Sequence, residues 1–234
     1  MALQPARSVL SLQGVTMGDS HFSGSLGKLD LELPRRSAAM VQVDDESDAE
    51  RLVDLCVGLV DPFAGRVRFL GVDWTTRSPA ERMHRRRRIG AVVQTDVWPA
   101  HMTVLDAVLL PSAYHFDRPR EEMLEHATEL TRLFGLPGLP TGRRETTPRR
   151  ALVRAACVRG FLGQPDLIVV QDQVLEQMAD LAVPMAQAIS AARDRGAAVL
   201  WIAASLAAQA AQFVEAEQLL RLGEHGLAQA RRGR

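Results

Sequence analysis

The sequence predicts an α/β fold with a mostly parallel core sheet. Short apolar segments typical of buried strands alternate with longer segments whose apolar residues recur at helical spacing. Strands that alternate with helices along a chain indicate a parallel sheet covered by helices. The length of 234 residues, with 47% hydrophobic residues, is enough to bury one large core. We therefore expect a single domain over residues 1–234.

The individual elements follow from local pattern and from turn residues. Residues 9–15 and 26–33 alternate apolar and polar side chains, as half-buried strands do. The other strands are short apolar runs, and the helices carry apolar residues three or four positions apart. We expect strands at 38–43, 65–70, 89–94, 167–170 and 197–203, helices at 47–60, 79–88, 104–136 with a break at 112–120, 147–162, 175–195 and 205–213, and a turn between short apolar runs at 218–227.

Composition excludes several classes of function. The net charge is zero, so no overall field favours nucleic acid or an anionic membrane, and we interpret the basic run at 84–88 as a solvated helix end. Cys56 and Cys157 lie on apolar helix faces, which predicts two buried thiols. No apolar run approaches the roughly 20 residues that span a bilayer. We expect a soluble chain with no nucleic-acid partner, which reaches a membrane only through another protein.

The segment between the strand ending at Val43 and the next helix is rich in carboxylates. A strand–loop–helix junction of this kind is where a phosphate-binding loop lies, and such a loop needs glycines, a lysine and a Ser or Thr for Mg²⁺. Residues 44–50 contain no glycine and no lysine, but five acidic residues. A polyphosphate beside them would be repelled by about 1 kcal/mol per close pair, even at a water-like dielectric.

The rest of the chain resembles an ABC transporter ATPase subunit along nearly its whole length. The resemblance is carried by the order and spacing of residues 61–67, 89–94, 102–108, 154–159 and 165–170, which match the family's segments from the Walker helix to Walker B. It implies an ABC-type P-loop ATPase fold, in which a mostly parallel core sheet has an antiparallel β edge. It also implies a helical subdomain inserted at approximately residues 95–162.

The functional motifs of that family are degenerate here. By alignment with the family, Walker A falls on Val43, Asp44, Asp45, Glu46, Ser47, Asp48, Ala49, Glu50 and Arg51, the signature on Thr147, Pro148, Arg149, Arg150 and Ala151, Walker B on Gln171 and Asp172, and the switch histidine on Ala204. The D-loop aspartate falls near Gln177 or Met178, and only Gln94 of the Q-loop is kept. The departures imply a pseudo-ATPase with no catalytic residue, no cofactor and no metal.

The acidic segment has a structural interpretation. Asp and Ser are favoured helix N-caps, and carboxylates in a first turn complement the helix dipole. We expect Asp44 or Ser47 to cap the helix, so that a carboxylate of the protein lies where a nucleotide phosphate would otherwise lie. His101, His115 and His126 show no metal-ligand spacing, and a metal site in the acidic loop is the weaker alternative.

The resemblance also implies partners. In the family, a groove beside the Q-loop receives a coupling helix of the membrane subunit, which here places Gln94, Val97, Trp98 and Met102 at an interface. The alternative is that Trp98 and Met102 fill the core. We expect a non-catalytic subunit of a bacterial ABC transporter, peripheral on the cytoplasmic face of the inner membrane, which docks on an integral membrane subunit and pairs with an active ATPase subunit or with itself. A stand-alone regulatory or scaffold protein is the alternative, and a weak nucleotide-dependent enzyme is a third possibility.

Overall fold

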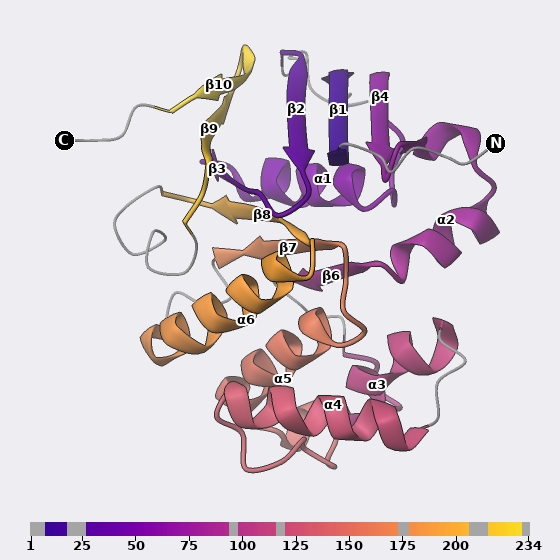
Figure 1. The fold of residues 1–234 in the computed structure, drawn as a ribbon, viewed down its shortest axis with the longest axis vertical. Coiled ribbons are helices and arrows are strands. Elements are labelled where there is room, and N and C mark those ends of the chain that lie inside the picture. The colour runs from indigo at the N-terminus through magenta and orange to yellow at the C-terminus, as the bar shows by residue number, and fades with distance from the viewer. Residues whose placement is uncertain are drawn as a thin grey trace.

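The structure is a computed structural model that describes residues 8–17, 27–93, 98–115, 120–172, 178–205 and 215–230. It contains two sheets and a layer of helices (Figure 1). The larger sheet has the strand order β10-β9-β3-β8-β7-β6, and the smaller sheet has the order β2-β1-β4-β5. The predicted α/β class with a mostly parallel core and a separate antiparallel part is confirmed.

The larger sheet is parallel apart from its last strand. Strands β3 (Ala38–Val43), β6 (Ile89–Val92), β7 (Leu167–Gln171), β8 (Ala198–Ala203) and β9 (Gln218–Gly223) run in one direction, and β10 (Gly226–Gln229) returns as a hairpin with β9. Every residue of β7 and β8 is buried, which explains why both segments are continuous apolar runs. The carboxyl ends of β3, β8 and β7 therefore meet at one edge of the sheet.

The smaller sheet is antiparallel throughout. It consists of β1 (Ser8–Thr16), β2 (Leu29–Pro34), β4 (Ala64–Phe69) and the short β5 (Val72–Asp73). In β2 buried and exposed residues alternate, as expected for a strand with one face toward the core. The buried face packs over helix α1 (Glu46–Cys56), whose other side lies against β3, β7 and β8 in the same apolar cluster.

Helices cover the opposite face of the parallel sheet. Helices α5 (Arg149–Phe161) and α6 (Ala182–Asp194) share one apolar cluster with α3 (Val104–His115) and α4 (Arg120–Leu133), and the helices α3, α4 and α5 form a separate layer (Figure 1). Short 3-10 turns lie at Trp74–Thr76, Arg144–Thr146 and Ala179–Leu181. The helix predicted at 205–213 lies outside the described residues, except for its first residue.

Helix α1 ends four residues before the predicted boundary at residue 60. Gly58 has a φ of +71°, and a Cβ atom there would lie 2.5 Å from the Trp74 ring. The chain turns at this glycine, where the Trp74 ring leaves no space for a side chain. Cys56 and Cys157 are free and fully buried, as predicted, and burial raises the pKa of each thiol to about 12.

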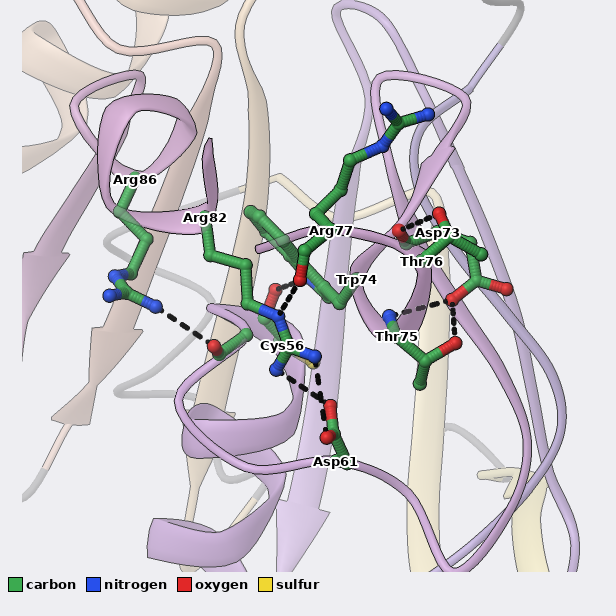
Figure 2. Close-up of polar contacts among 10 residues, drawn as sticks. Cys56, Asp61, Asp73, Trp74, Thr75, Thr76, Arg77, Arg82 and Arg86 are labelled. Carbon is green, nitrogen blue, oxygen red and sulfur yellow. Dashed lines mark hydrogen bonds and ion pairs between the residues drawn. The ribbon is translucent and has the colours of Figure 1, made fainter. Parts of the chain in front are cut away.

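Arginines of the basic helix α2 (Pro79–Arg86) form hydrogen bonds with the turn after α1 (Figure 2). The Arg82 guanidinium donates to both carboxylate oxygens of Asp61, at 2.7 and 3.3 Å, and Arg86 donates to the Gly58 carbonyl at 2.9 Å. The Trp74 indole N–H donates to the Cys56 carbonyl at 3.3 Å. Interpreting residues 84–88 only as a solvated helix end was therefore wrong for Arg86, which binds a carbonyl at the end of α1.

Close packing between β6 and α5 generates a first prediction. A Cβ atom on Gly90 would lie 1.8 Å from the Gly160 carbonyl oxygen, so Gly90→Ala forces the helix and the strand apart. We expect it to lower the free energy of unfolding by about 1–3 kcal/mol, measured by urea denaturation. Gly138→Ala is the matched control, because no atom lies within 4 Å of the added methyl group. Equal stabilities of the two variants would contradict this packing.

Candidate functional site

The first turn of α1 is capped by the chain itself. Asp45, in extended conformation, is the N-cap residue, and its Oδ1 accepts hydrogen bonds from the backbone N–H groups of Ser47 at 2.8 Å and Asp48 at 3.1 Å. Hydrogen bonds from the Ser47 hydroxyl and from these backbone groups lower the pKa of Asp45. The predicted N-caps were wrong: Asp44 lies one residue before the observed N-cap, Asp45, and Ser47 lies two residues after it. The backbone after Val43 places the second aspartate, and not the first, at the N-terminus of the helix.

The neighbouring carboxylates have different surroundings. Asp44 accepts from Arg221 at 2.6 Å and from the Gln42 amide at 3.0 Å, and the hydrogen bond from Arg221 is the main reason why the pKa of Asp44 is lowered. Glu46 and Glu50 are exposed and form no ion pair with another described residue. The segment predicted at Walker A therefore presents negative charge to solvent, with Arg221 as a partner of Asp44.

This arrangement has a consequence for anions. The N-terminus of a helix binds phosphate through free backbone N–H groups and the positive end of the dipole. Here Asp45 already takes two of these N–H groups, and Glu46 and Asp48 add further charge in the same turn. A phosphate would have to displace the Asp45 carboxylate and remain beside the other two.

Other predicted positions meet at the same edge of the sheet. Gln171 is the last residue of β7 and is 4% exposed, Asp172 follows it half-buried, and Ala204 lies exposed immediately after β8. The structure thus gathers the positions assigned to Walker A, Walker B and the switch at the carboxyl ends of β3, β7 and β8. Across the described ranges, no group of three or more His, Cys, Asp or Glu side chains is arranged to hold a metal ion.

The segment assigned to the signature starts α5. Pro148 is the N-cap and provides no side-chain hydrogen bond, while the Thr147 hydroxyl donates to the Arg143 carbonyl at 2.8 Å. Arg149 and Arg150 are exposed at the start of the helix, with Ala151 half-buried behind them. Arg150 pairs with Asp180 at 3.2 Å, and Arg154 pairs with the same carboxylate. The start of α5 therefore lies beside the segment that follows β7.

An apolar groove runs beside α1 and β6. Its cavity volume is about 370 Å³. The residues that line it come from α1 and the turn after it, from the end of α2, from β6 and the residue after it, and from β7: Glu50, Val53, Asp54, Val57, Leu59, Arg86, Ile89, Ala91, Val93 and Gln171. Leu59 is 59% exposed at the rim. Burial raises the pKa of Asp54. Val53, Val57 and Ile89 were not predicted to line a site, because in the sequence they have the spacing of core residues.

The residues predicted at the partner interface are not gathered in this groove. Trp98 is 5% exposed, belongs to the apolar core, and carries the Arg159 guanidinium 4.7 Å above its ring. Of the two placements that the sequence left open for Trp98, a partner interface and the core, the burial of its ring fits the core. Met102 lines a different groove on α3, and Gln94 and Val97 lie outside the described residues.

Solved structures of ATP-binding cassettes share this architecture. The dimeric structure of MJ0796, a bacterial ABC transporter cassette, matches with a TM-score of 0.78 at 17% identity over 96% of this chain and 100% of that chain. The MJ0796 post-hydrolysis dimer bound to ADP and Pi gives 0.76 at 16% identity, over 96% and 100% of the two chains. The protein cbiO1 from Clostridium perfringens, part of the ABC transporter complex cbiONQ, gives 0.72 at 14% identity over 95% and 87%.

Sequence comparison adds no closer relative, since no protein-family model and no curated protein matches the chain. The architecture alone defines the class: this chain has the fold of an ABC transporter ATP-binding cassette, as the resemblance in its sequence implied.

The cap on α1 generates a second prediction. Asp45→Ala leaves the Ser47 and Asp48 N–H groups without their acceptor and should lower the melting temperature by about 2–4 °C at pH 7. Asp44→Ala removes the same charge, together with an exposed ion pair with Arg221 and an exposed hydrogen bond from Gln42, and should have a smaller effect. An equal loss in the two variants would show that Asp45 acts through its charge alone.

The same pair of proteins has an expected pH dependence. The folded pKa of Asp45 lies below its ordinary value of 3.8, so its contribution is fully present above that pH and is lost as the pH falls through the folded value. The difference in melting temperature between the native chain and Asp45→Ala should be constant from about pH 7 to pH 5 and shrink below about pH 4. If the difference in melting temperature grew as the pH fell, the assignment of the ionised Asp45 carboxylate as the N-cap would be contradicted.

Proposed function

We propose that this chain is a non-catalytic cassette subunit of an ABC transporter. Its role is to dock on an integral membrane subunit and to pair with a second cassette. The observation that carries the proposal is the Asp45 carboxylate at the start of α1, which takes backbone N–H groups that a phosphate would need. The chain keeps the architecture of an ATPase but fills its phosphate site with its own side chain.

The surroundings of that site support the absence of turnover. At Walker B, Gln171 supplies an amide in place of the carboxylate that would support Mg²⁺, and it is buried. Ala204 has no side chain able to move a proton, and Pro148 has no hydroxyl for a phosphate. Asp172 remains as a carboxylate, but with no phosphate cradle beside it there is no substrate for it to act on.

The groove beside α1 supports a docking role. Its lining combines the apolar residues Val53, Val57, Leu59, Ile89 and Val93 with the charged residues Glu50, Asp54 and Arg86. Such a surface fits an amphipathic helix with an apolar face, and the occupant we propose is a cytoplasmic helix of the membrane subunit. Val93, which lines the groove, directly precedes Gln94, one of the residues at which the sequence predicts the partner.

The remaining features agree with a peripheral subunit. None of the helices in the described part of the chain is both long enough and apolar enough to cross a membrane. The similar cassette cbiO1 is part of an ABC transporter complex, and MJ0796 forms a dimer. By analogy, we propose that this chain lies on the inner face of the cytoplasmic membrane as one of two cassettes in a complex.

The proposal predicts that the chain does not bind nucleotide. Isothermal titration calorimetry with ATP or ADP and Mg²⁺ should give no heat of binding up to about millimolar nucleotide. A dissociation constant above about 1 mM corresponds to a binding free energy weaker than about −4 kcal/mol. The MJ0796 cassette, which was solved with ADP and Pi, is the positive control in the same buffer. A dissociation constant in the micromolar range would overturn the non-catalytic assignment.

The proposal also predicts that a charge in the groove releases the chain from membranes. Leu59→Arg puts a cation at the apolar rim, and should reduce the membrane-bound fraction in source cells at least ~10-fold. Because Leu59 is 59% exposed, the melting temperature should change little. Val183→Arg, at a 67% exposed position on α6, is the matched control and should stay bound. Equal membrane recovery of both variants would exclude this groove as the docking surface.

A further inference from the structure

One carboxylate in the wall of the groove beside α1 has no partner among the described residues. Asp54 lies in the last turn of α1 and lines the groove with Val53, Val57 and Leu59. Its backbone carbonyl accepts the N–H groups of Leu59 and Val60, but its side chain forms no hydrogen bond or ion pair with any residue that the structure describes. The Asp54 carboxylate is therefore held beside apolar side chains without a cation.

A second carboxylate lies one helical turn before Asp54. Glu50 also lines the groove, is exposed, and forms no ion pair with another described residue. Residues four positions apart lie on the same side of a helix, so Glu50 and Asp54, the groove carboxylates, follow each other along the α1 wall. They do not stabilise α1, because like charges at this spacing repel each other. This wall of the groove therefore presents negative charge.

The arginines nearest to the groove carboxylates have other partners. Arg86, which lines the groove, donates to the Gly58 carbonyl at 2.9 Å, and burial lowers its pKa. Arg51, which follows Glu50 in the sequence, pairs with Asp48 at 3.9 Å. Within the described part of the chain, neither arginine forms an ion pair with a groove carboxylate. The negative charge of this wall is thus left for a cation from outside the chain.

An apolar helix that docked in the groove would remove water from Asp54. A carboxylate that loses water without gaining a partner destabilises the complex. Burial already raises the pKa of Asp54 in the free chain, so its contact with water is restricted before docking. A cationic side chain on the docking helix removes this penalty. Lysine and arginine suit this role, because their aliphatic stems pack on residues such as Val53 and Val57 while the charged end reaches a carboxylate.

We infer that the helix which docks in this groove carries a lysine or arginine among its apolar residues, and that Asp54 receives this cation with Glu50 one turn away. The inference rests on the docking role proposed above and adds the charge that the partner must have. The groove then selects a helix with a cation opposite Asp54 over an equally apolar helix without one, because the second helix leaves a carboxylate buried and unpaired.

The direction of the effect of one substitution tests the inference. Purified chain is added to membranes of the source cells that have been stripped of peripheral proteins, and the dissociation constant is measured by co-sedimentation. Asp54→Asn removes the charge at nearly constant shape, and should weaken binding at least ~10-fold because the cation of the partner loses its carboxylate. If the docking helix brings no cation, the same change removes an unpaired carboxylate from the interface. Unchanged or tighter binding of Asp54→Asn therefore overturns the inference.

Three further variants separate charge from shape. Asp54→Glu keeps the negative charge and should bind within ~3-fold of the native chain, whereas Asp54→Lys brings two cations together and should bind at least ~100-fold more weakly. Changes at Asp54 should alter the melting temperature little, because its side chain has no partner among the described residues. Asp194→Asn, at the exposed end of α6, is the matched control and should bind like the native chain. A loss in Asp194→Asn equal to that in Asp54→Asn would show a general effect of charge and overturn the inference.

The same membranes distinguish this inference from the proposed function. Native-like binding of Leu59→Arg, or no binding of the native chain, overturns the docking role and the inference with it. Loss of binding in Leu59→Arg together with unchanged or tighter binding of Asp54→Asn leaves the docking role standing and overturns only the inference. Membranes treated with protease beforehand should bind no chain, and binding that survives this treatment would identify lipid as the partner and contradict the inference. The calorimetry with nucleotide is independent of all these results.

Discussion

The enclosure of α1 between two sheets is the constraint on which the rest of the structure depends. Its buried residues contact the antiparallel sheet on one side and β3, β7 and β8 on the other, so the helix joins both sheets into one apolar cluster. Both ends are held by side chains: Asp45 at the first turn, and Arg86 with Trp74 at the last. The acidic residues at the start of α1 and the α1 side of the groove keep their positions because this helix is fixed.

The cap on α1 is the physical basis of the function proposed above. A free helix N-terminus binds phosphate through its backbone N–H groups, whereas here the Asp45 carboxylate accepts two of them. Under the proposed function, a site that holds no phosphate has no need for the other residues that would surround one, and this is how we account for the residues found at 147–151, Gln171 and Ala204.

Much of the fold was predictable from the sequence, because the spacing of apolar residues along a segment indicates which of its faces are buried. The runs in β7 and β8 are apolar at every position since both faces of these strands are covered, and β2 alternates since one face is not. What periodicity does not encode is the identity of the covering element. Trp98 was placed at an interface because an apolar side chain in a loop has the same pattern whether it faces a partner or the core.

The residues of the groove and of the helix cap also could not be predicted fully from the local sequence pattern. A second apolar stripe on α1, through Val53 and Val57, was a signal that the helix has two covered sides, but the rim residue Leu59 follows from the turn at Gly58, which depends on the distant Trp74. Similarly, the choice of Asp45 over Asp44 depends on where β3 ends. The turn before Leu59 thus depends on a contact between residues far apart in sequence, and the cap depends on where a strand of the sheet ends.

The two buried thiols can report on the opening of two different parts of the protein. Cys56 belongs to the apolar cluster that encloses α1, and Cys157 belongs to the cluster beneath the helical layer, on the opposite face of the parallel sheet. A thiol reacts as the thiolate, which burial suppresses at both positions while the fold is closed. Alkylation of one cysteine before the other would therefore reveal which half of the protein opens first, without any engineered label.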